Sequence, residues 1–420
     1  MNVLIVNTSE LTGGAAVAAN RLMKALGNSG VKVKMMVRQK QTDNPDVVAV
    51  GSKFGNFLRF CYERLVIFLN NRLSRRNLFA VSIANTGIDI TKTREFREAD
   101  VIHLHWINQG MLSLRNIRQI LDSGKPVVWT MHDMWPATAI CHYAHACKKY
   151  ENKCENCPTI LQNGLKIDLS DKIWKRKLRM LEERQISFVA CSRWLRDQAQ
   201  GSRLLNGQFI TNIPNAIDMQ TFRPHARNEA REKLGLPIEG RIILFVSQRV
   251  TDTRKGTVFL IEAIEKMLAR HPEMKENTSI AILGGHAEEL TGHFPLPAYP
   301  LGYVSEQEKI VEIYNAADVF VLPSLSDNLP NTIMEAMACG VPCVGFDVGG
   351  IPEMIDHRKN GYVAAFRDAD DLATGIHWVL QEADHDELSQ QAVEKVLASY
   401  SEAQVASRYM EIYQKALNHD

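Results

Sequence analysis

The sequence predicts an α/β protein made of two doubly wound, parallel-sheet domains in tandem. Short apolar strands alternate with helical segments in the first half of the chain, and a second alternating series begins after residue 240. A proline-containing stretch, 205–240, separates the two series and reads as a junction. At 420 residues the chain is also too long for one hydrophobic core.

The elements of the first series follow from short apolar runs and from helical spacing of apolar residues. A polar loop over 9–14 separates the first strand from the first helix. The expected strands are Val3–Val6, Val31–Arg38, Val101–His105, Pro126–Thr130 and Phe188–Cys191, and Ala15–Leu26 is the expected first helix.

The second series repeats the same alternation, and no short-period repeat accompanies it. Its expected strands are Arg241–Ser247, Ser279–Leu283, Asp318–Pro323 and Val341–Phe346, and its expected helices are Gly256–Arg270, Asp370–Ala383 and Ser401–Leu417.

These elements suggest three parts. Residues 1–215 would form an N-terminal Rossmann-like domain that carries a cysteine-rich insert over 141–157, and residues 216–400 would form the second Rossmann-like domain. The closing helix, 401–420, would pack back on the first domain. In tandem pairs of this kind, we expect the two domains to face each other across a cleft that holds the ligand.

The overall composition is that of a globular protein without unusual partners. The 49 basic and 48 acidic residues nearly cancel, which argues against bulk nucleic-acid binding. No apolar run reaches bilayer length, and the first strand lacks the basic start and long apolar region of a signal peptide. We therefore expect a cytoplasmic protein, with a position at the inner face of the membrane left open.

The stretch from Pro323 to Gly340 predicts a ligand site in the second domain. It reads as a strand end, a polar turn and a helix that opens after Pro330. The start of this helix, at Asn331 and Thr332, offers backbone N–H groups that suit a phosphate. Carboxylates bind sugar hydroxyls better than phosphate, so Asp327 and Glu335 beside this anion site indicate a nucleotide-sugar site.

A basic loop follows the first strand of the second domain. Arg249 stands at the strand end and Lys255 precedes the next helix, and together they could neutralise a diphosphate. In isolation such a loop is more often a solvated surface feature, and only its match to the downstream helix start favours the phosphate role.

Several ordered motifs resemble the family 4 retaining glycosyltransferases of the GT-B fold, of the type found in bacterial polysaccharide biosynthesis. The resemblance extends over essentially the whole chain, although the family usually has Gly where Ala216 stands in the inter-domain motif. The matching motifs are Arg249 with Lys255-Gly256, Asp327 and Glu335, Gly349-Gly350-x-Pro352-Glu353, Asn360-Gly361-Tyr362, and Asn215-Ala216-Ile217-Asp218 with Phe222 and Pro224.

The resemblance implies roles for the matching residues of the second domain. Arg249 and Lys255 would hold the donor diphosphate, and Glu335 would bind the ribose hydroxyls. Asp327 would contact the transferred sugar, at a position where the family usually has the longer Glu. Tyr303 and Val304 fall where such enzymes meet the base, although packing is an equal explanation for Tyr303.

In the first domain, the resemblance singles out a glycine loop and a histidine. Gly13 and Gly14 would line the cleft near the donor phosphate, although a lone Gly-Gly without the full dinucleotide fingerprint is weak evidence by itself. His132, at a strand end, would contact the donor sugar near the reacting carbon. For His103 we favour a structural role.

The insert holds Cys141, Cys147, Cys154 and Cys157, with His142 and His145 as spare ligands. This spacing suits a structural zinc ion, and the closing C-x-x-C is a common zinc-knuckle element. Two disulfides and four free thiols remain alternatives, the disulfides being disfavoured in a reducing cytosol. We expect the insert to shape the acceptor entrance and to take no part in catalysis.

Residues 54–79 form a basic amphipathic stretch. Its apolar residues recur at helical spacing and five arginines accompany them. It could lie on an anionic membrane and meet a lipid-linked acceptor, or it could be an ordinary amphipathic helix packed on its own sheet.

The sequence as a whole predicts a retaining glycosyltransferase of the hexosyltransferase class. It would move a sugar from a nucleoside diphosphate to a saccharide or lipid-linked saccharide acceptor, in surface polysaccharide biosynthesis. We expect no cofactor to be required, because no D-x-D motif is placed to hold a divalent metal. A nucleotide-sugar epimerase and a non-catalytic nucleotide-sugar-binding protein are the alternatives, and a dinucleotide oxidoreductase is a weaker one.

Overall fold

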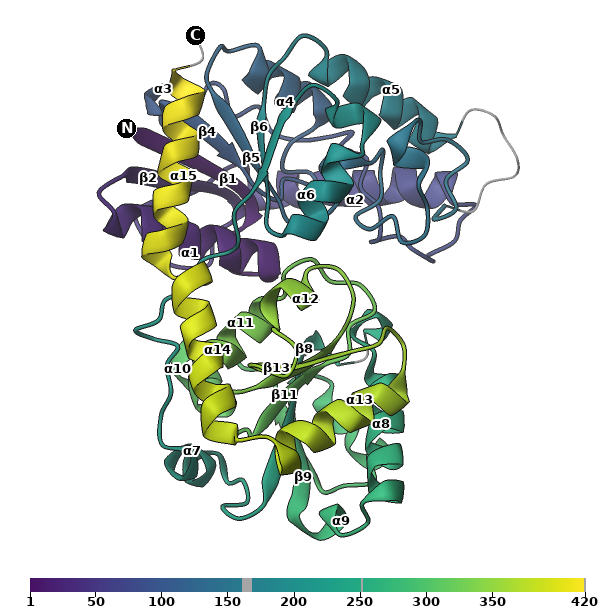
Figure 1. The fold of residues 1–420 in the computed structure, drawn as a ribbon. Helices are drawn as coiled ribbons and strands as arrows, with labels where there is room; N and C mark the ends of the chain where they lie inside the picture. The colour runs from purple at the N-terminus through teal and green to yellow at the C-terminus, as the bar shows by residue number, and fades with distance from the viewer. Residues whose placement is uncertain (161–167, 251, 419–420) are drawn as a thin grey trace. The chain divides into compact units, whose positions relative to one another are not determined.

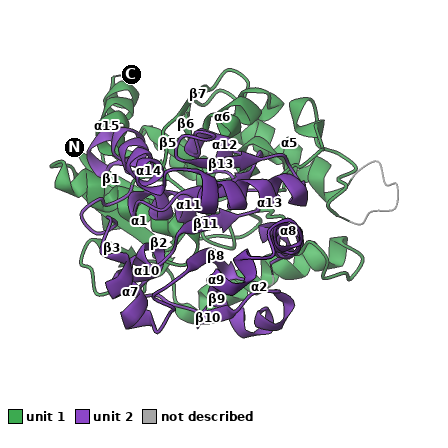
Figure 2. Cartoon of the chain, turned by 60° about the horizontal axis from the view of Figure 1, so that its bottom comes forward, with its two compact units in different colours: residues 1–216, 405–420 green, residues 217–404 purple. Residues whose placement is uncertain are grey.

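The computed structural model describes residues 1–160, 168–250 and 252–418. The chain divides into two compact units, of which unit 1 comprises Met1–Ala216 with Val405–Asp420 and unit 2 comprises Ile217–Gln404 (Figure 2). The boundaries lie one and four residues beyond the expected ones. Ile217 pairs with Ser401, and its N–H donates to the carbonyl of Tyr400, so these residues stay together in unit 2. Residues 419–420 of the expected closing helix lie outside the described residues.

Unit 1 contains, within its described residues, a seven-stranded parallel sheet in the order β3-β2-β1-β4-β5-β6-β7. Helices cover both faces of this sheet (Figure 1). The strands are β1 (Asn2–Ser9), β2 (Lys32–Gln39), β3 (Val47–Ala49), β4 (Val101–Leu104), β5 (Val127–Met131), β6 (Ser187–Ala190) and β7 (Phe209–Asn212). The helices are α1 (Gly14–Asn28), α2 (Lys53–Asn70), α3 (Arg94–Glu98), α4 (Leu114–Leu121), α5 (Leu169–Leu181), α6 (Arg193–Gln200) and α15 (Glu402–Leu417).

Strand β1 shows why this sheet needs helices on both sides. Successive side chains of a strand point to opposite faces. Leu4 and Val6 join one buried cluster, while Val3 and Ile5 join the other, together with apolar residues of α1 and α15. A strand that is apolar on both faces is typical of a parallel sheet with two helical layers.

Unit 2 contains a six-stranded parallel sheet in the order β10-β9-β8-β11-β12-β13, again counted over the described part of the chain. The strands are β8 (Arg241–Arg249), β9 (Thr278–Gly285), β10 (Ala298–Gly302), β11 (Val319–Leu322), β12 (Cys343–Phe346) and β13 (Gly361–Ala364). The helices are α7 (Arg227–Leu234), α8 (Thr257–Arg270), α9 (Met274–Asn277), α10 (Gln307–Asn315), α11 (Asn331–Ala338), α12 (Ile351–Met354), α13 (Ala369–His377) and α14 (His385–Tyr400).

Two sequence expectations about the elements were wrong. The stretch 205–240 is not only a junction, because it contains strand β7 and helix α7. The helix expected to run to Ala383 changes after α13 into a π-helical turn, Trp378–Glu382. A π-turn keeps the apolar spacing of a helix approximately, so periodicity alone does not reveal it.

Candidate functional site

The strand order of unit 2 places its candidate residues at a topological switch point. From β8 the chain goes to β9 on one side of the sheet, and it later returns to β11 on the other side. In open α/β sheets, ligands bind outside the carboxyl ends of the strands at such a point. The loop with Arg249 and Lys255 follows β8, and the turn with Asp327 follows β11.

Two glycines allow the loops at this edge of the sheet to pack closely against one another. Gly256 has a φ of 70°, and a Cβ there would stand 1.9 Å from the carbonyl oxygen of Pro323. Gly349 has a φ of 60°, and a Cβ there would stand 1.7 Å from the carbonyl oxygen of Asp327. A side chain at either position would separate the loops, so glycine is required for the close approach. The N–H of Leu325 also donates to the carbonyl of Arg254, at 2.7 Å.

This packing joins Lys255 to Asp327. The ammonium Nζ of Lys255 lies 2.6 Å from Oδ2 of Asp327, and the hydroxyl of Ser324 lies 3.3 Å from the same oxygen. The two side chains are 24% and 16% exposed, so the pair is partly shielded from solvent and open on one side. A cation held in this way is positioned to meet an anionic ligand while the carboxylate limits its movement.

Helix α11 begins at Asn331, four residues after Asp327 of this ion pair. Pro330 is its N-cap residue and forms no side-chain cap hydrogen bond. Asn331 and Thr332, the first helical residues, are half-buried. The positive end of a helix dipole favours a phosphate at this place.

Glu335 lies one turn further along α11 and is buried. Its Oε2 accepts a hydrogen bond from the hydroxyl of Tyr314 on α10, at 2.9 Å. A carboxylate accepts hydrogen bonds on both of its oxygens, and this bond from Tyr314 orients the group. The sequence reasoning missed Tyr314, because the contact joins two helices on either side of β11 and leaves no local signal.

The remaining candidates of unit 2 are exposed, except Val304. The side chain of Arg249 is exposed at the end of β8. Tyr303 follows the edge strand β10 and is 67% exposed, whereas Val304 is half-buried. This exposure rules out packing as the explanation for Tyr303. It does not bring Tyr303 to the switch point, since β9 lies between β10 and β8.

In unit 1, the switch point lies between β1 and β4. Gly13 has a φ of 93° and precedes α1, which has no side-chain cap, and Gly14 at the helix start is exposed. The loop is fixed by Glu10, which is fully buried and accepts from the N–H groups of Gln41 and Thr42 and from the hydroxyl of Thr42. Burial raises the pKa of Glu10, but these hydrogen bonds outweigh it and the pKa lies below its usual range.

His132 lies at the carboxyl end of β5, is half-buried, and contacts the buried residues His105 and Cys191. Its Nε2 is 2.9 Å from Nδ1 of His105, and its Nδ1 is 3.5 Å from Sγ of Cys191. Burial lowers the pKa of His132 to about 4. At neutral pH, His132 is therefore an uncharged imidazole, which has one N–H donor and one acceptor nitrogen.

His103 connects the sheet to the closing helix. Its Nδ1 lies 2.7 Å from the hydroxyl of Tyr413, and its Nε2 lies 2.7 Å from the hydroxyl of Thr130. Tyr409 meets the same threonine at 2.8 Å. All these groups are buried, which fits the structural role favoured from the sequence. Helix α15 is thus attached to unit 1 by hydrogen bonds as well as by apolar packing.

Asp133 ties the cysteine-rich insert to the end of β5. Its Oδ2 accepts from the indole N–H of Trp106 at 2.9 Å and lies 2.7 Å from Nδ1 of His142. The other ring nitrogen of His142 meets the hydroxyl of Ser82 at 3.1 Å. The use of His142 as a spare metal ligand was therefore wrong, because both its nitrogens hold the insert in place.

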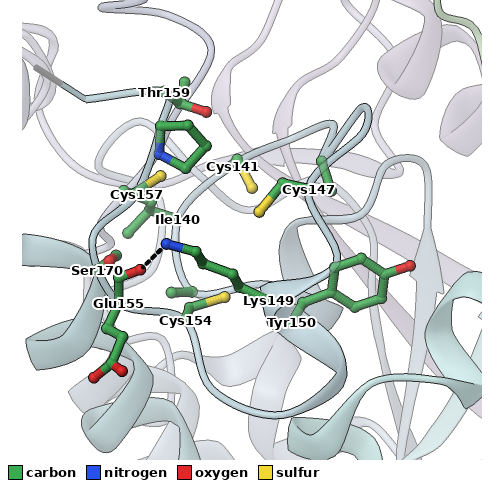
Figure 3. A pocket seen from close by; sticks show the side chains of 13 residues that line it. Ile140, Cys141, Cys147, Lys149, Tyr150, Cys154, Glu155, Cys157, Thr159 and Ser170 are labelled. Carbon is green, nitrogen blue, oxygen red and sulfur yellow. Dashed lines mark hydrogen bonds between the residues drawn. The ribbon is translucent and has the colours of Figure 1, made fainter.

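The four cysteines of the insert line one hollow (Figure 3). All four are free thiols, and burial raises the pKa of Cys141 to about 12 and that of Cys154 to about 11. Within the described residues, no group of three His, Cys, Asp or Glu side chains is arranged to hold a metal ion. The zinc site therefore stays a prediction.

Comparison with known proteins identifies the families whose models match the two halves of the chain. Residues 12–221 match the family model described as Glycosyltransferase Family 4, and residues 240–382 match the one described as Glycosyl transferases group 1. A D-inositol 3-phosphate glycosyltransferase of Corynebacterium jeikeium is 24% identical over 87% of this chain and 82% of its own length. D-inositol 3-phosphate glycosyltransferase 2 of Catenulispora acidiphila is 31% identical, over 41% of this chain and 42% of that protein.

A solved structure shares the fold along nearly the whole chain. The Anabaena protein HepE, crystallised with UDP-glucose, superposes with a TM-score of 0.64 at 16% identity. The match covers 99% of this chain and all of HepE. The matched family models show that the chain belongs to glycosyltransferase family 4 and is a glycosyltransferase, and this superposition with the two parallel sheets shows that it has the GT-B fold.

Proposed function

We propose that the protein is a retaining hexosyltransferase that uses a nucleoside diphosphate sugar as donor. The acceptor would be a saccharide or a lipid-linked saccharide in surface polysaccharide biosynthesis. The observation that carries the donor assignment is the ion pair between Lys255 and Asp327 beside the start of α11. At this edge of the sheet lie a cation and the N-terminus of a helix, which suit a diphosphate. The carboxylate beside them suits the hydroxyl groups of a sugar.

The cationic groups of unit 2 would stabilise the departing diphosphate. Lys255 and Arg249 supply positive charge, and the amide end of α11 adds the helix dipole. The bond between the anomeric carbon and the phosphate oxygen breaks, and negative charge gathers on the diphosphate. Interactions that become stronger as this charge develops stabilise the transition state more than the bound substrate, and they therefore lower the activation barrier.

The acceptor hydroxyl would then attack the same face of the oxocarbenium-like sugar. A bond forms between its oxygen and the anomeric carbon, and its proton passes to the leaving phosphate oxygen. Asp327 would hold a hydroxyl of the transferred sugar. This assignment of the proton fits the state of His132, whose lowered pKa leaves it neutral and able to orient the sugar without moving a proton.

Glu335 would bind the ribose, since its carboxylate is fixed by Tyr314 and is one helical turn from the phosphate end of α11. Tyr303 and Val304 would meet the base, and Gly13 and Gly14 are proposed as further donor contacts. The related D-inositol 3-phosphate glycosyltransferases and the UDP-glucose bound to HepE support a nucleotide-sugar donor and a hydroxylic acceptor.

The test combines a donor screen with product analysis. Purified protein is incubated with individual nucleotide sugars and a panel of oligosaccharide and lipid-linked acceptors, and products are detected by mass spectrometry. We expect one donor to give a product whose anomeric configuration, measured by NMR, equals that of the donor. Inversion would refute the retaining mechanism, and conversion of a donor to an isomer without acceptor would show an epimerase instead.

A further inference from the structure

Helix α2 is an 18-residue helix whose inner face is fixed to unit 1 (Figure 1). The hydroxyl of Ser52 caps its N-terminus by accepting from the N–H of Gly55. Glu63 is fully buried and accepts from the N–H groups of Ile83 and Ala84, at 2.8 and 3.0 Å. Arg64, also buried, donates to the carbonyl of Leu78 at 2.6 Å. These contacts determine which side of the helix faces outward.

The outward side of α2 is apolar. Its large side chains recur three or four residues apart, which places them on one face of a helix. They are between 50% and 72% exposed, so unit 1 does not cover them. We call the following set the α2 apolar face: Phe54, Phe57, Leu58, Tyr62, Leu65 and Leu69.

The chain after α2 extends this exposed surface. Leu73 and Phe79 are 64% and 61% exposed. Among the described residues, the segment 54–79 contains eight of the sixteen exposed large hydrophobic side chains of the chain. Single exposed apolar residues are normal on a soluble protein, but a contiguous set of this size usually marks an interaction surface.

The exposed charged residues of the segment 53–79 have one sign. Lys53, Arg72, Arg75 and Arg76 are exposed. Glu63 is the only acidic residue between positions 53 and 79, and it is buried in its hydrogen bonds to unit 1. The segment therefore presents an apolar helix face with a purely cationic border.

We propose that the α2 apolar face docks on the anionic phospholipid surface of a membrane. The apolar side chains would enter the boundary between headgroups and acyl chains, and the cationic border would meet the lipid phosphates. The attachment is peripheral: over residues 1–160, 168–250 and 252–418, none of the helices combines the length and the hydropathy that crossing a bilayer demands. A second copy of the chain fits less well, because its own cationic border would then approach this one.

The test measures binding of the full chain to vesicles by co-sedimentation. Vesicles of phosphatidylcholine are compared with vesicles that also contain phosphatidylglycerol. We expect binding to the anionic vesicles only, reduced at least tenfold when salt is raised from about 0.1 M to about 1 M, because screening shortens the reach of the cationic border.

Two matched pairs of variants separate the apolar and charged contributions. Leu58→Ser with Leu65→Ser should weaken vesicle binding at least tenfold, while Leu178→Ser with Leu397→Ser, equally exposed leucines on α5 and α14, should not change it.

For charge, Arg75→Gln with Arg76→Gln should weaken binding about tenfold. The control Arg176→Gln with Arg179→Gln removes two exposed arginines from α5 and should leave binding unchanged. Circular dichroism and thermal unfolding establish that each variant is folded, and all these positions lie outside the proposed donor and acceptor machinery.

Three outcomes would overturn the proposal. One is no binding of the wild-type protein to anionic vesicles. Another is equal loss of binding in the α2 variants and in their controls. The third is a dimer in analytical ultracentrifugation that the Leu58→Ser, Leu65→Ser variant dissociates, with no vesicle binding, which would assign the face to self-association. Vesicle binding is measured without donor or acceptor, so its failure leaves the sugar-transfer proposal intact.

Discussion

The substitution Lys255→Met removes the charge from the proposed diphosphate site and keeps most of the side-chain volume. Two unit charges about 4 Å apart interact by about 4 kcal/mol at an effective dielectric constant of about 20. The Lys255 side chain is 24% exposed, so we reduce this to about 2–3 kcal/mol for its contact with a diphosphate oxygen. The expected loss in kcat/KM is then roughly 30- to 150-fold. Because charge on the diphosphate grows in the transition state, kcat should fall as well as KM rise.

The assay follows release of nucleoside diphosphate under initial-rate conditions, with the donor found in the screen. Lys233→Met is the matched control, since Lys233 also forms an ion pair, 2.9 Å from Glu312, but lies on α7. Both variants should lose no more than about 1 kcal/mol in the free energy of unfolding. The reasoning is refuted if both Lys255→Met and the control Lys233→Met keep kcat and KM within about threefold of the wild-type values.

Further predictions concern unit 1. Burial lowers the pKa of His103 to about 3, so as the pH falls below about 6.5 the unfolded chain takes up a proton that the folded chain does not. The free energy of unfolding should then fall by up to about 1.4 kcal/mol per pH unit because of this group. In urea titrations at several pH values, His103→Gln should flatten the slope of unfolding free energy against pH. The control His286→Gln, at an exposed histidine, should not change this slope. Tyr413→Phe leaves Nδ1 of His103 without its hydroxyl partner and should cost about 1–3 kcal/mol in unfolding free energy, and an unchanged urea midpoint would contradict the anchoring of α15. Elemental analysis should find one zinc per chain, lost in Cys154→Ser with Cys157→Ser; a metal-free protein with thiols that react with Ellman's reagent would contradict the zinc prediction.

The main features of the fold could be predicted from the sequence because the central strands are apolar on both faces. The run Val3–Val6 is such a case, and it became the centre of a two-layered core. The elements that were missed are of another kind. Strand β10 contains Pro300 and β13 begins with Gly361, so neither gives a continuous run of apolar strand-forming residues. Strand β7 also lacks a fully apolar run, because it lies at the edge of the sheet and its residues are half-buried or exposed.

The site was predictable where a residue type and a strand end coincide, as for Lys255 and Asp327. Gly256, which has a positive φ, explains why these two loops meet, and Gly349 packs the loop after β12 against Asp327. What the sequence could not show is the set of partners. The bond from Tyr314 to Glu335 joins residues of different helices, and the neutral state of His132 follows from burial beside His105. Both depend on tertiary packing, which no local pattern encodes.

The most direct measurement for the central claim is a crystal structure of the protein soaked with UDP or GDP. The account predicts that the diphosphate lies at the carboxyl edge of β8 and β11, within hydrogen-bonding distance of Lys255 and the start of α11, with a ribose hydroxyl on Glu335. A nucleotide bound elsewhere, with Lys255 still paired only to Asp327, would contradict it.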